Sequence, residues 1–521
     1  MTTVPSPVFH DPALPAASTA ARWRWPDIAL LFVVLAIAGV VQCIYIQPEP
    51  SFDELWHLML STGRGTPVGF FSPDQLFEAC ERLTSLAGAP PIWRIWTTLD
   101  GMPHPPLYFV LLRLWREVVG ESDRVGNALS IACSLVGVAF TFAAGRLAMN
   151  CWAAALAGLA LGCAQTQVYL AQEMRPYALA TAIAAAALWL MTRIELLGPT
   201  RAAAIALAAL TLPLMLTHYF TVGTCIAISV YGFARLRPFR MTFTLTLVTG
   251  AIVFAIAWLG FALRQAHDAG PANDYLRTDR LDLLREVALL ACAPFRLIAD
   301  REYTVERLAL LSGVLFVLPW MLARRLRPLM PWGLALCGGI VPVFLVDVFG
   351  LRTHLNIIRY AAVASPAVML LFVGCAWAID RRLAYATGAT VLAAGLAYLV
   401  SRNPVVGECP DFARSIAIVE RSAAPDDAIL CYAGTAPRFY ADMMALTATH
   451  SHTLLPRPLM VFTKPISSDV RARLPARAWI LSGHFDRPLE ELIPGARVVS
   501  TRVADLEVVV TLVELQDGAT Q

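Results

Sequence analysis

The sequence predicts an all-α polytopic membrane protein that carries a small α/β domain at its C-terminal end. Of its 521 residues, 57% are hydrophobic and only 15% are charged, whereas a soluble domain carries about 25% charged residues. The hydrophobic residues gather in long apolar runs up to about residue 400, and shorter alternating segments follow. A net charge of +3 is too small to indicate a nucleic-acid partner.

Eleven apolar runs are candidates for membrane-spanning helices, and several are close to the minimum length of about 17 residues. Arginines at the ends of these runs mark alternate loops, and such loops usually face the cytoplasm. This pattern predicts a cytoplasmic N-terminus and an extracytoplasmic C-terminus. The runs lie near residues 27–46, 124–146, 152–171, 176–193, 201–217, 220–234, 241–263, 306–322, 332–350, 358–379 and 383–400.

One more helical segment, residues 104–119, is expected to lie at the membrane surface without crossing it. It is short and contains Arg113 and Arg116. If it crossed, every later arginine-rich loop would face outward, against the usual bias. We therefore assign it to a long first outer loop, residues 47–123, whose aromatic residues suit a membrane interface.

Beyond about residue 403 the sequence indicates a small α/β domain outside the membrane. Strands are predicted at 428–432, 478–482 and 508–513, and residues 411–421 have helical periodicity. The predicted organisation is a disordered cytoplasmic N-terminus (1–26), a transmembrane domain (27–403) and an extracytoplasmic α/β domain (404–521).

The 11 cysteines are scattered and form no CxxC pair, so neither a zinc site nor a redox motif is predicted. Most lie inside apolar runs, where cysteine behaves as a small hydrophobic residue. Pairing of Cys409 with Cys431 in an oxidising compartment is left open.

Asp53 and Glu54 form an adjacent pair of carboxylates just after the first apolar run. One interpretation is a general base at the membrane surface that removes a proton from an acceptor nucleophile. The other is a solvated helix N-terminus, where both acids interact favourably with the helix dipole. The predicted topology puts the pair on the extracytoplasmic face and leaves both interpretations open.

A polar segment between two apolar runs, residues 172–177, falls on the same face and contains Glu173 and Arg175. Arginine is well suited to bind phosphate, and burying such charges at a helix end without a purpose is costly. A local Glu–Arg ion pair at the interface is the alternative interpretation.

Three shorter polar groups also face outward in the predicted topology. His104 precedes two prolines that can begin a helix, so it either contacts a phosphate or caps the helix. Arg359 lies against the positive-inside bias, which favours a role in anion binding. The pairs are His218 with Tyr219 and Arg359 with Tyr360.

In this order, these stretches resemble the GT-C superfamily of integral membrane glycosyltransferases. The likeness is to the branch that holds protein O-mannosyltransferase-like proteins and the aminoarabinose transferase of lipid A. It runs from about residue 27 to 440 and implies a GT-C fold with about 11–13 transmembrane helices. The matching motifs are Phe52-Asp53-Glu54, His104-Pro-Pro-Leu-Tyr, Gln172-Glu-Met-Arg-Pro-Tyr177, His218-Tyr-Phe220, Arg359-Tyr360 with Pro366, and the tail around 411–430.

The resemblance implies an inverting transferase that moves a sugar from a polyprenyl-phosphate donor to an extracytoplasmic glycan, lipid or protein of the cell envelope. Asp53 would be the general base, and Glu54 would orient the acceptor or hold the site. The residues implied to bind the donor phosphate are His104, Arg175 and Arg359, and those implied to support the site are Glu173, Tyr177, His218, Tyr219 and Tyr360.

The resemblance also implies a location in the bacterial inner membrane, with the active site and C-terminus facing the periplasm. A metal-binding DxD motif is absent, so no cofactor is expected, although a divalent metal is left open. The large lumenal domain of the eukaryotic mannosyltransferases is missing, which puts a protein acceptor in doubt. The alternative function is a transporter or flippase for lipid-linked sugars, which would need ionisable residues at the bilayer midplane; the apolar runs here are nearly free of charge.

Overall fold

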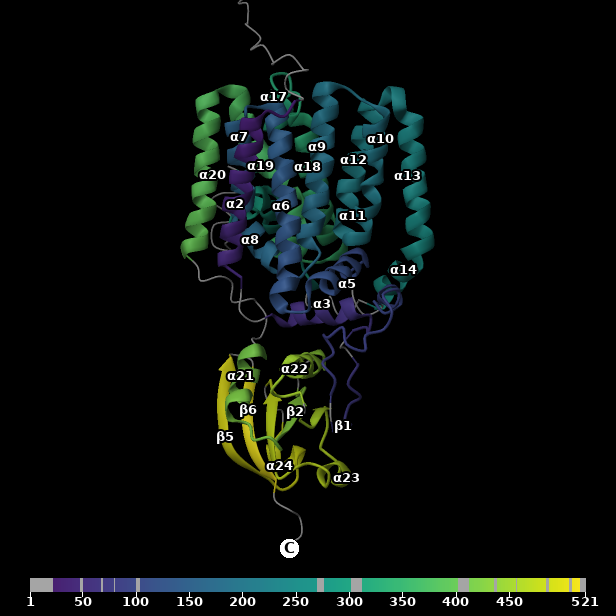
Figure 1. Cartoon of the computed structure of the whole chain (residues 1–521), viewed down its shortest axis with the longest axis vertical. Helices are drawn as coiled ribbons and strands as arrows, with labels where there is room; N and C mark the ends of the chain where they lie inside the picture. Colours follow the sequence, from purple (N-terminus) through teal and green to yellow (C-terminus); the bar gives the residue numbers. More distant parts are fainter. Residues whose placement is uncertain are drawn as a thin grey trace, which may run out of the picture.

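The computed structural model shows a bundle of long helices with a small α/β domain at one end (Figure 1). The predicted disordered N-terminus, up to residue 21, and Cys409 lie outside the described residues. The structure describes residues 22–46, 50–66, 69–78, 80–99, 104–268, 276–300, 312–401, 412–434, 438–455, 457–483, 487–505 and 508–515.

Seven helical units within the described residues are long and apolar enough to cross a membrane. They match seven of the eleven predicted spans and confirm the fold class of a polytopic helical protein with a C-terminal α/β domain. The units are α2 (Trp25–Ile44), α6 (Asp123–Ala148), α9 (Tyr177–Leu197), Arg237–His267, α18 (Leu329–Gly350), Ile358–Ile379 and α20 (Arg381–Ser401).

Two of these units contain more than one helix. Arg237–His267 joins η2 (Arg237–Phe239), α13 (Arg240–Phe254), the π-helical turn η3 (Ala255–Leu259) and α14 (Gly260–Asp268). Ile358–Ile379 joins η8 (Ile358–Ala364) and α19 (Ser365–Ile379).

An eighth span forms if the bent pair α7 (Cys151–Cys163) and α8 (Gln165–Gln172) crosses as one unit. The two helices meet at 56°, because Ala164 between them has extended backbone. The break leaves the Gln165 amide without a partner inside the helix, and this amide donates to the carbonyl of Ile298 at 2.8 Å. A neighbouring segment thus satisfies the backbone group that the bend sets free.

The other three predicted spans are shorter in the structure. Residues 201–217 divide into α10 (Arg201–Ala209) and α11 (Thr211–Thr217), and 220–234 correspond to α12 (Val222–Arg235) after η1 (Tyr219–Thr221). The run at 306–322 lies partly outside the described residues; its described part holds η6 (Val314–Phe316) and α17 (Leu318–Leu322).

The short helix α12 packs closely against α18 within the same bundle. A Cβ atom at Gly223 would lie 2.2 Å from the carbonyl oxygen of Gly338. Only glycine therefore allows the two backbones to approach this closely, as is common where helices meet in membranes.

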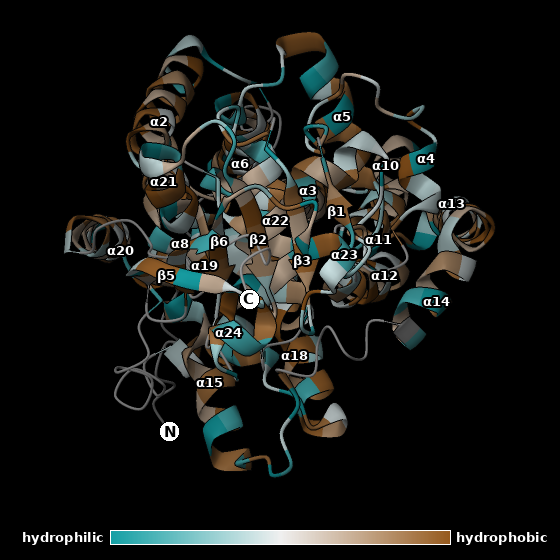
Figure 2. Cartoon of the chain, turned by 90° about the horizontal axis from the view of Figure 1, so that it is seen from below, coloured by the Kyte–Doolittle hydropathy of each residue, from teal (hydrophilic) through white to brown (hydrophobic). Residues whose placement is uncertain are grey.

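The outermost helices expose hydrophobic side chains, as a surface in contact with lipid requires. Seen from below, α2, α13 and α20 lie at the edge of the bundle (Figure 2). Phe32 and Val40 of α2 are 66% and 59% exposed, and Met241 of α13 is 73% exposed. These values would be unfavourable in water and are ordinary in a bilayer.

Two helices, α3 (Phe52–Thr62) and α5 (Leu107–Val119), lie at the end of the bundle nearest the α/β domain (Figure 1). With 13 residues, α5 is too short to span a membrane, in agreement with the interfacial helix predicted for residues 104–119. Between α3 and α5 the chain forms β1 (Leu76–Phe77) and α4 (Arg94–Thr97). Along the chain, α15 (Leu283–Arg296) precedes α18 and η7 (His354–Asn356) follows it.

The α/β domain contains a six-stranded sheet in the order β1-β3-β2-β4-β6-β5. Strand β2 is parallel to both β3 and β4, and β6 is antiparallel to β4 and β5. The three predicted strands match β2, β4 and β6, whereas β1, β3 and β5 were not predicted. The bounds are β2 (Ala428–Tyr432), β3 (Leu459–Phe462), β4 (Arg477–Ser482), β5 (Ala496–Asp505), β6 (Val508–Leu515), α21 (Phe412–Ser422), α22 (Phe439–His450), α23 (Ser468–Arg471) and α24 (Leu489–Leu492).

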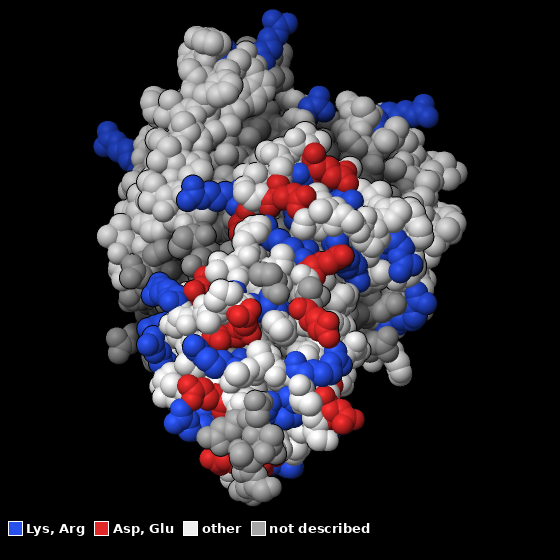
Figure 3. Space-filling view, turned by 60° about the horizontal axis from the view of Figure 1, so that its bottom comes forward, with Lys and Arg blue, Asp and Glu red and all other residues white. Residues whose placement is uncertain are grey.

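The first outer loop contributes an edge strand to this sheet. β1 pairs antiparallel with β3, and Leu76 lies opposite Met460. The loop and the α/β domain therefore form one folded unit, although more than 300 residues separate β1 from β3 in sequence. The surface of this unit carries intermixed acidic and basic side chains (Figure 3), as expected for a face in water.

The α/β domain packs directly on α3 through aromatic side chains. The ring of Phe439 in α22 lies 6.0 Å from Phe52 and 5.4 Å from Trp56 between centroids, and Phe412 lies 5.7 Å from Phe52. In addition, the Gly69 amide donates to Asp442 at 3.0 Å. One continuous hydrophobic core thus joins the outer domain to the helix that begins with the acid pair.

Candidate active site

The residues predicted to form a site come together where α3 meets the end of the bundle. Five segments contribute, and each is a helix start or a turn between helices, so its polar groups are available. The segments are 51–57, the turn at 104, 173–177, 218–220 and 354–360.

Helix α3 begins in a capping box that engages the second acid of the pair. The hydroxyl of Ser51 accepts from the Glu54 amide, and Glu54 Oε2 accepts from the Ser51 amide at 2.8 Å. The other oxygen, Oε1, accepts from Asn127 Nδ2 at 2.9 Å and from the Met174 amide at 3.2 Å. With 5% exposure and two partners beyond its own helix start, Asn127 and the Met174 amide, Glu54 holds α3 against α6 and the turn after α8.

Asp53, one residue earlier, faces the other way and is more accessible. Its Oδ2 forms an ion pair with Arg175 Nη1 at 2.9 Å, and its side chain is 18% exposed. Burial raises the pKa of the Asp53 carboxyl, but the positive charges of Arg175 and Arg359 outweigh this effect and bring the pKa below its ordinary value. Asp53 is therefore ionised at neutral pH and available to accept a hydrogen bond.

Arg175 is held centrally by the turn between α8 and α9. It pairs with Glu173 at 3.6 Å as well as with Asp53, and its guanidinium lies 5.4 Å from the centre of the Tyr177 ring. The turn approaches α6 closely, because a Cβ atom at Gly126 would lie 2.1 Å from the sulfur of Met174. The position of Arg175 thus depends on a glycine about 50 residues away.

Three histidines and a tyrosine line the same region. The His104 ring lies 5.8 Å from His57, 5.1 Å from His218 and 6.4 Å from Tyr177 between centroids. Tyr177 lies 5.1 Å from His218 and 6.3 Å from Tyr360. The rings form a row from α3 to the 354–360 segment.

Burial keeps the three histidines neutral. It lowers the pKa of His57 to about 4 and that of His218 to about 3, with the charge of Arg175 acting in the same direction. Burial and the neighbouring His218 also lower the pKa of His104 well below its ordinary value. Within the described residues, no three His, Cys, Asp or Glu side chains are arranged to hold a metal ion.

His57 is a site residue that the sequence reasoning missed. It lies four residues after Asp53 on α3, and residues at this spacing share one face of a helix. That spacing was a signal that could have identified it.

Arg359 and Tyr360 reach the site from a segment that is fixed by buried polar contacts. Asp347 at the end of α18 accepts from the amides of His354 and Leu355 at 2.8 and 2.7 Å. Arg296 at the end of α15 donates to the Leu355 carbonyl at 2.6 Å. These bonds fix the backbone just before Arg359, which lies 5.7 Å from the centre of the Tyr360 ring.

Tyr219 is directed away from this cluster. Its hydroxyl donates to Gln265 Oε1 at 2.5 Å and accepts from Trp258 Nε1 at 2.9 Å. Trp258 lies in the π-helical turn η3, where the additional residue in the turn directs the side chain inward, and it is fully buried. Tyr219 therefore links the Arg237–His267 unit to the bundle.

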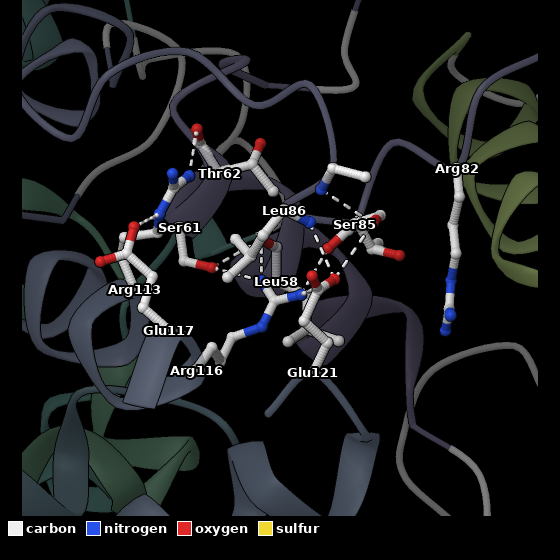
Figure 4. Close-up of polar contacts among 12 residues, drawn as sticks. Leu58, Ser61, Thr62, Arg82, Ser85, Leu86, Arg113, Arg116, Glu117 and Glu121 are labelled. Atoms are coloured by element: carbon white, nitrogen blue, oxygen red, sulfur yellow. Dashed lines mark hydrogen bonds and ion pairs between the residues drawn. The ribbon is translucent and has the colours of Figure 1, made fainter. Parts of the chain in front are cut away.

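Two buried arginines of α5 hold the other end of α3 (Figure 4). Arg116 donates to the Leu58 carbonyl at 3.2 Å, to Ser61 Oγ at 2.8 Å and to the Thr84 carbonyl at 2.5 Å. Arg113 donates to the Thr62 carbonyl at 3.1 Å. Cations at a helix C-terminus satisfy its free carbonyls and oppose its dipole. The sequence analysis treated both arginines only as topology signals.

Several buried polar atoms of the cluster have no hydrogen-bond partner within the described part of the chain. Leaving such atoms unpaired costs about 1–3 kcal/mol each, which points to a polar ligand that pairs with them. The atoms are His57 Nε2, His104 Nδ1, Tyr177 Oη, His218 Nε2 and Arg359 Nε.

The fold is similar to that of ArnT from Cupriavidus metallidurans. The apo structure of that protein superposes with a TM-score of 0.55 at 14% sequence identity, over 94% of this chain and 98% of ArnT. The structure of ArnT bound to undecaprenyl phosphate gives a TM-score of 0.54 at 14% identity, over 93% and 97% of the two chains. An oligosaccharyltransferase from Archaeoglobus fulgidus gives 0.46 at 11% identity, over 88% and 70%. No protein-family model and no curated protein sequence matches the chain.

Proposed function

From the GT-C fold of this chain, we propose that it is an inverting glycosyltransferase that moves a sugar from a polyprenyl-phosphate donor to an acceptor in the cell envelope. The observation that carries this proposal is the accessible carboxylate of Asp53, held at 2.9 Å from Arg175 beside a row of unpaired buried polar atoms. A base next to a cluster of cations is the arrangement that the transfer of a group from an anionic leaving group requires.

In the proposed reaction, Asp53 accepts the proton of an acceptor hydroxyl as its oxygen attacks the anomeric carbon of the sugar. The bond from that carbon to the phosphate oxygen breaks at the opposite face, so the configuration inverts. The electron pair leaves with the polyprenyl phosphate, whose negative charge Arg175 and Arg359 stabilise. Because the pKa of Asp53 lies below its ordinary value, the carboxylate is ready to accept at neutral pH.

Glu54 takes a different role in this proposal. Its two oxygens accept hydrogen bonds from Ser51, Asn127 and the Met174 amide, and its side chain is less exposed than that of Asp53. We assign it to holding the site, and not to proton transfer. The general base is Asp53 alone.

A polyprenyl phosphate as the lipid carrier is supported by two observations. The fold resembles that of ArnT, which has been captured with undecaprenyl phosphate, and a long isoprenoid chain needs an apolar environment that only a membrane protein offers. The arginine-rich loops favour a cytoplasmic N-terminus, with the site and the α/β domain in the periplasm of a bacterial inner membrane.

Transport of a lipid-linked sugar is the competing function, and the placement of charge speaks against it. A transporter would need ionisable residues near the bilayer midplane. In the described spans, buried charges lie within a turn of a helix end, as for Asp27 of α2, Arg146 of α6 and Asp347 of α18. The middle of the described spans thus carries no such buried charge, which supports an enzyme over a transporter.

The experiment that tests the proposal compares Asp53→Asn with wild type. Each purified protein is given a radiolabelled pool of polyprenyl-phosphate sugars and membrane extract, and labelled product is counted. We expect Asp53→Asn to lower transfer at least about 100-fold, as is typical for loss of a general base. The matched control is Asp469→Asn, an exposed carboxylate of the α/β domain, which should transfer at the wild-type rate.

Two results would contradict the proposal. If folded Asp53→Asn transfers label as fast as wild type, Asp53 is only a helix N-terminus. If wild type transfers no label but moves lipid-linked sugar across vesicle membranes, the protein is a transporter.

A further inference from the structure

Two of the three histidines of the site, His57 and His218, have hydrogen-bonding directions that the backbone fixes. The Nδ1 atom of His57 lies 2.5 Å from the carbonyl oxygen of Asp53. A carbonyl can only accept, so Nδ1 carries the proton. On a neutral ring the other nitrogen, Nε2, is then a lone-pair acceptor, and this atom is buried without a partner within the described residues. His57 therefore offers the site an acceptor.

His218 has the opposite polarity. Its Nδ1 atom accepts from the amide of Phe220 at 3.2 Å, and a backbone amide can only donate. The proton of the neutral ring must therefore be on Nε2, which is likewise buried and unpaired within the described part of the chain. His218 offers the site a donor. The low pKa values of both rings, about 4 and about 3, agree with this neutral state.

At each end of the row of rings, the neighbouring side chains have the same hydrogen-bonding polarity as the histidine there. At the His57 end lies the carboxylate of Asp53, on the same face of α3, which also accepts. At the His218 end lie Tyr177 at 5.1 Å and Tyr360 at 6.2 Å between ring centroids. The hydroxyl of Tyr177 and the Nε of the neighbouring Arg359 are donors that have no partner among the described residues. His104 lies between the two ends.

We propose that this row orients the head group of a glycosyl phosphate, with the phosphate at the His218 end and a sugar hydroxyl at the His57 end. Phosphate oxygens only accept hydrogen bonds, so they fit a set of donors. A sugar hydroxyl can donate, so it fits the acceptor His57, and Asp53 beside it receives the hydroxyl of the attacking acceptor. This inference rests on the proposed function and adds which side chains bind each part of the donor. His57 is the residue that binds a hydroxyl group.

Arg175 fits this orientation because it contacts both ends. Its guanidinium pairs with Asp53 at 2.9 Å and lies 5.4 Å from the Tyr177 ring. In the proposed orientation it is next to the bond that breaks, where negative charge develops on the phosphate oxygen. The attacking hydroxyl approaches from the Asp53 side, opposite the phosphate, as inversion requires.

The test separates the two ends by their ligands. Affinity is measured for bare undecaprenyl phosphate and for its sugar-loaded form, with wild type, His57→Phe and His218→Phe in detergent micelles. Phenylalanine keeps an aromatic ring and removes the nitrogens. His267→Phe, at an exposed position of α14, is the matched control and should behave as wild type.

We expect His218→Phe to weaken both ligands by about tenfold or more, since a hydrogen bond to a charged group is lost. His57→Phe should weaken only the sugar-loaded form to a similar extent. If His57→Phe weakens both ligands equally, or if His218→Phe weakens only the sugar-loaded form, the orientation is overturned while the proposed function is left intact. If wild type binds neither ligand, the proposed function itself fails.

A second measurement determines the tautomers in the wild-type protein itself. In wild-type protein with ¹⁵N-labelled histidine, ¹⁵N chemical shifts distinguish the two neutral tautomers. We expect the proton on Nδ1 of His57 and on Nε2 of His218, assigned by loss of the signal in each variant. The same tautomer at both histidines, or a charged ring at neutral pH, would overturn the inference.

Discussion

Replacing Arg116 with methionine is expected to destabilise the protein and to loosen α3. Arg116 is 2% exposed, and it donates to three groups on two segments, the carbonyls of Leu58 and Thr84 and the hydroxyl of Ser61. Methionine has a similar length but no donor, so all three groups lose the bond from Arg116, although the Leu58 carbonyl keeps the bond from the Ser61 hydroxyl at 2.7 Å.

The magnitude follows from the number and kind of bonds. A hydrogen bond to a charged group contributes about 1.5–3 kcal/mol net, so three would amount to roughly 5–9 kcal/mol. Relief of the cost of burying the guanidinium offsets part of this. Breaking a buried charge network in other proteins costs about 3–5 kcal/mol, and we expect a loss of free energy of unfolding in that range for Arg116→Met.

The assay combines thermal unfolding in detergent at a fixed scan rate with hydrogen exchange of the α3 amides. Arg116→Lys should lose less stability than Arg116→Met, because the lysine ammonium keeps the positive charge. It should still be less stable than wild type, because an ammonium lacks the planar fork of donors with which arginine reaches both segments. Arg124→Met is the control, at an exposed position at the start of α6, and should change stability by less than about 0.5 kcal/mol.

The outcome that refutes the reasoning is specific. If Arg116→Met unfolds at the wild-type temperature and its α3 amides exchange at the wild-type rate, Arg116 does not hold the helix. The last turn of α3 would then be fixed by packing and by the bond from Arg113 to the Thr62 carbonyl.

Three further predictions follow from the same contacts. First, thermal stability should fall as pH decreases below about 6.5: the unfolded chain binds protons at its histidines there, whereas burial holds the pKa of His218 at about 3. His218→Gln should flatten this dependence of stability on pH. Glu54→Gln should steepen it, because burial raises the pKa of Glu54 to about 7 and Glu54 therefore binds its proton more tightly in the folded state. Unchanged slopes would contradict both assignments. Second, Gly126→Ala should lower turnover at least about tenfold by displacing the turn that carries Arg175, with a stability cost of about 1–3 kcal/mol; wild-type turnover would mean that the turn tolerates the shift. Third, Phe439→Ala should cost about 2 kcal/mol for a half-buried ring and make the α/β domain more sensitive to limited proteolysis; an unchanged cleavage pattern would show that the other contacts suffice.

The sequence determined the architecture of this protein because architecture depends on local patterns. Apolar runs long enough to span a membrane can be identified from the sequence alone, and the alternation of polar and apolar residues identified three of the strands in the α/β domain. The 13-residue α5 was also predictable, since its length and arginines disagree with a crossing. The motifs that suggested a GT-C fold follow one another in the sequence, and in the structure they lie at one end of the bundle.

The tertiary structure decided which members of those motifs face the site. Two adjacent carboxylates look alike in sequence, but Glu54 meets donors 73 and 120 residues away, at Asn127 and Met174, and Asp53 does not. Tyr219 lies beside His218 in the chain and points away from it, toward Trp258.

The same holds for contacts that tie distant segments together. The strand β1 completes a sheet whose other members lie beyond residue 427, and the last turn of α3 ends on an arginine of α5. Hydrogen bonds and ion pairs between segments far apart in sequence leave no periodic signal in either segment. Their partners exist only once the chain has folded, and for that reason the spans, but not the polarity of the site, could be predicted from the sequence.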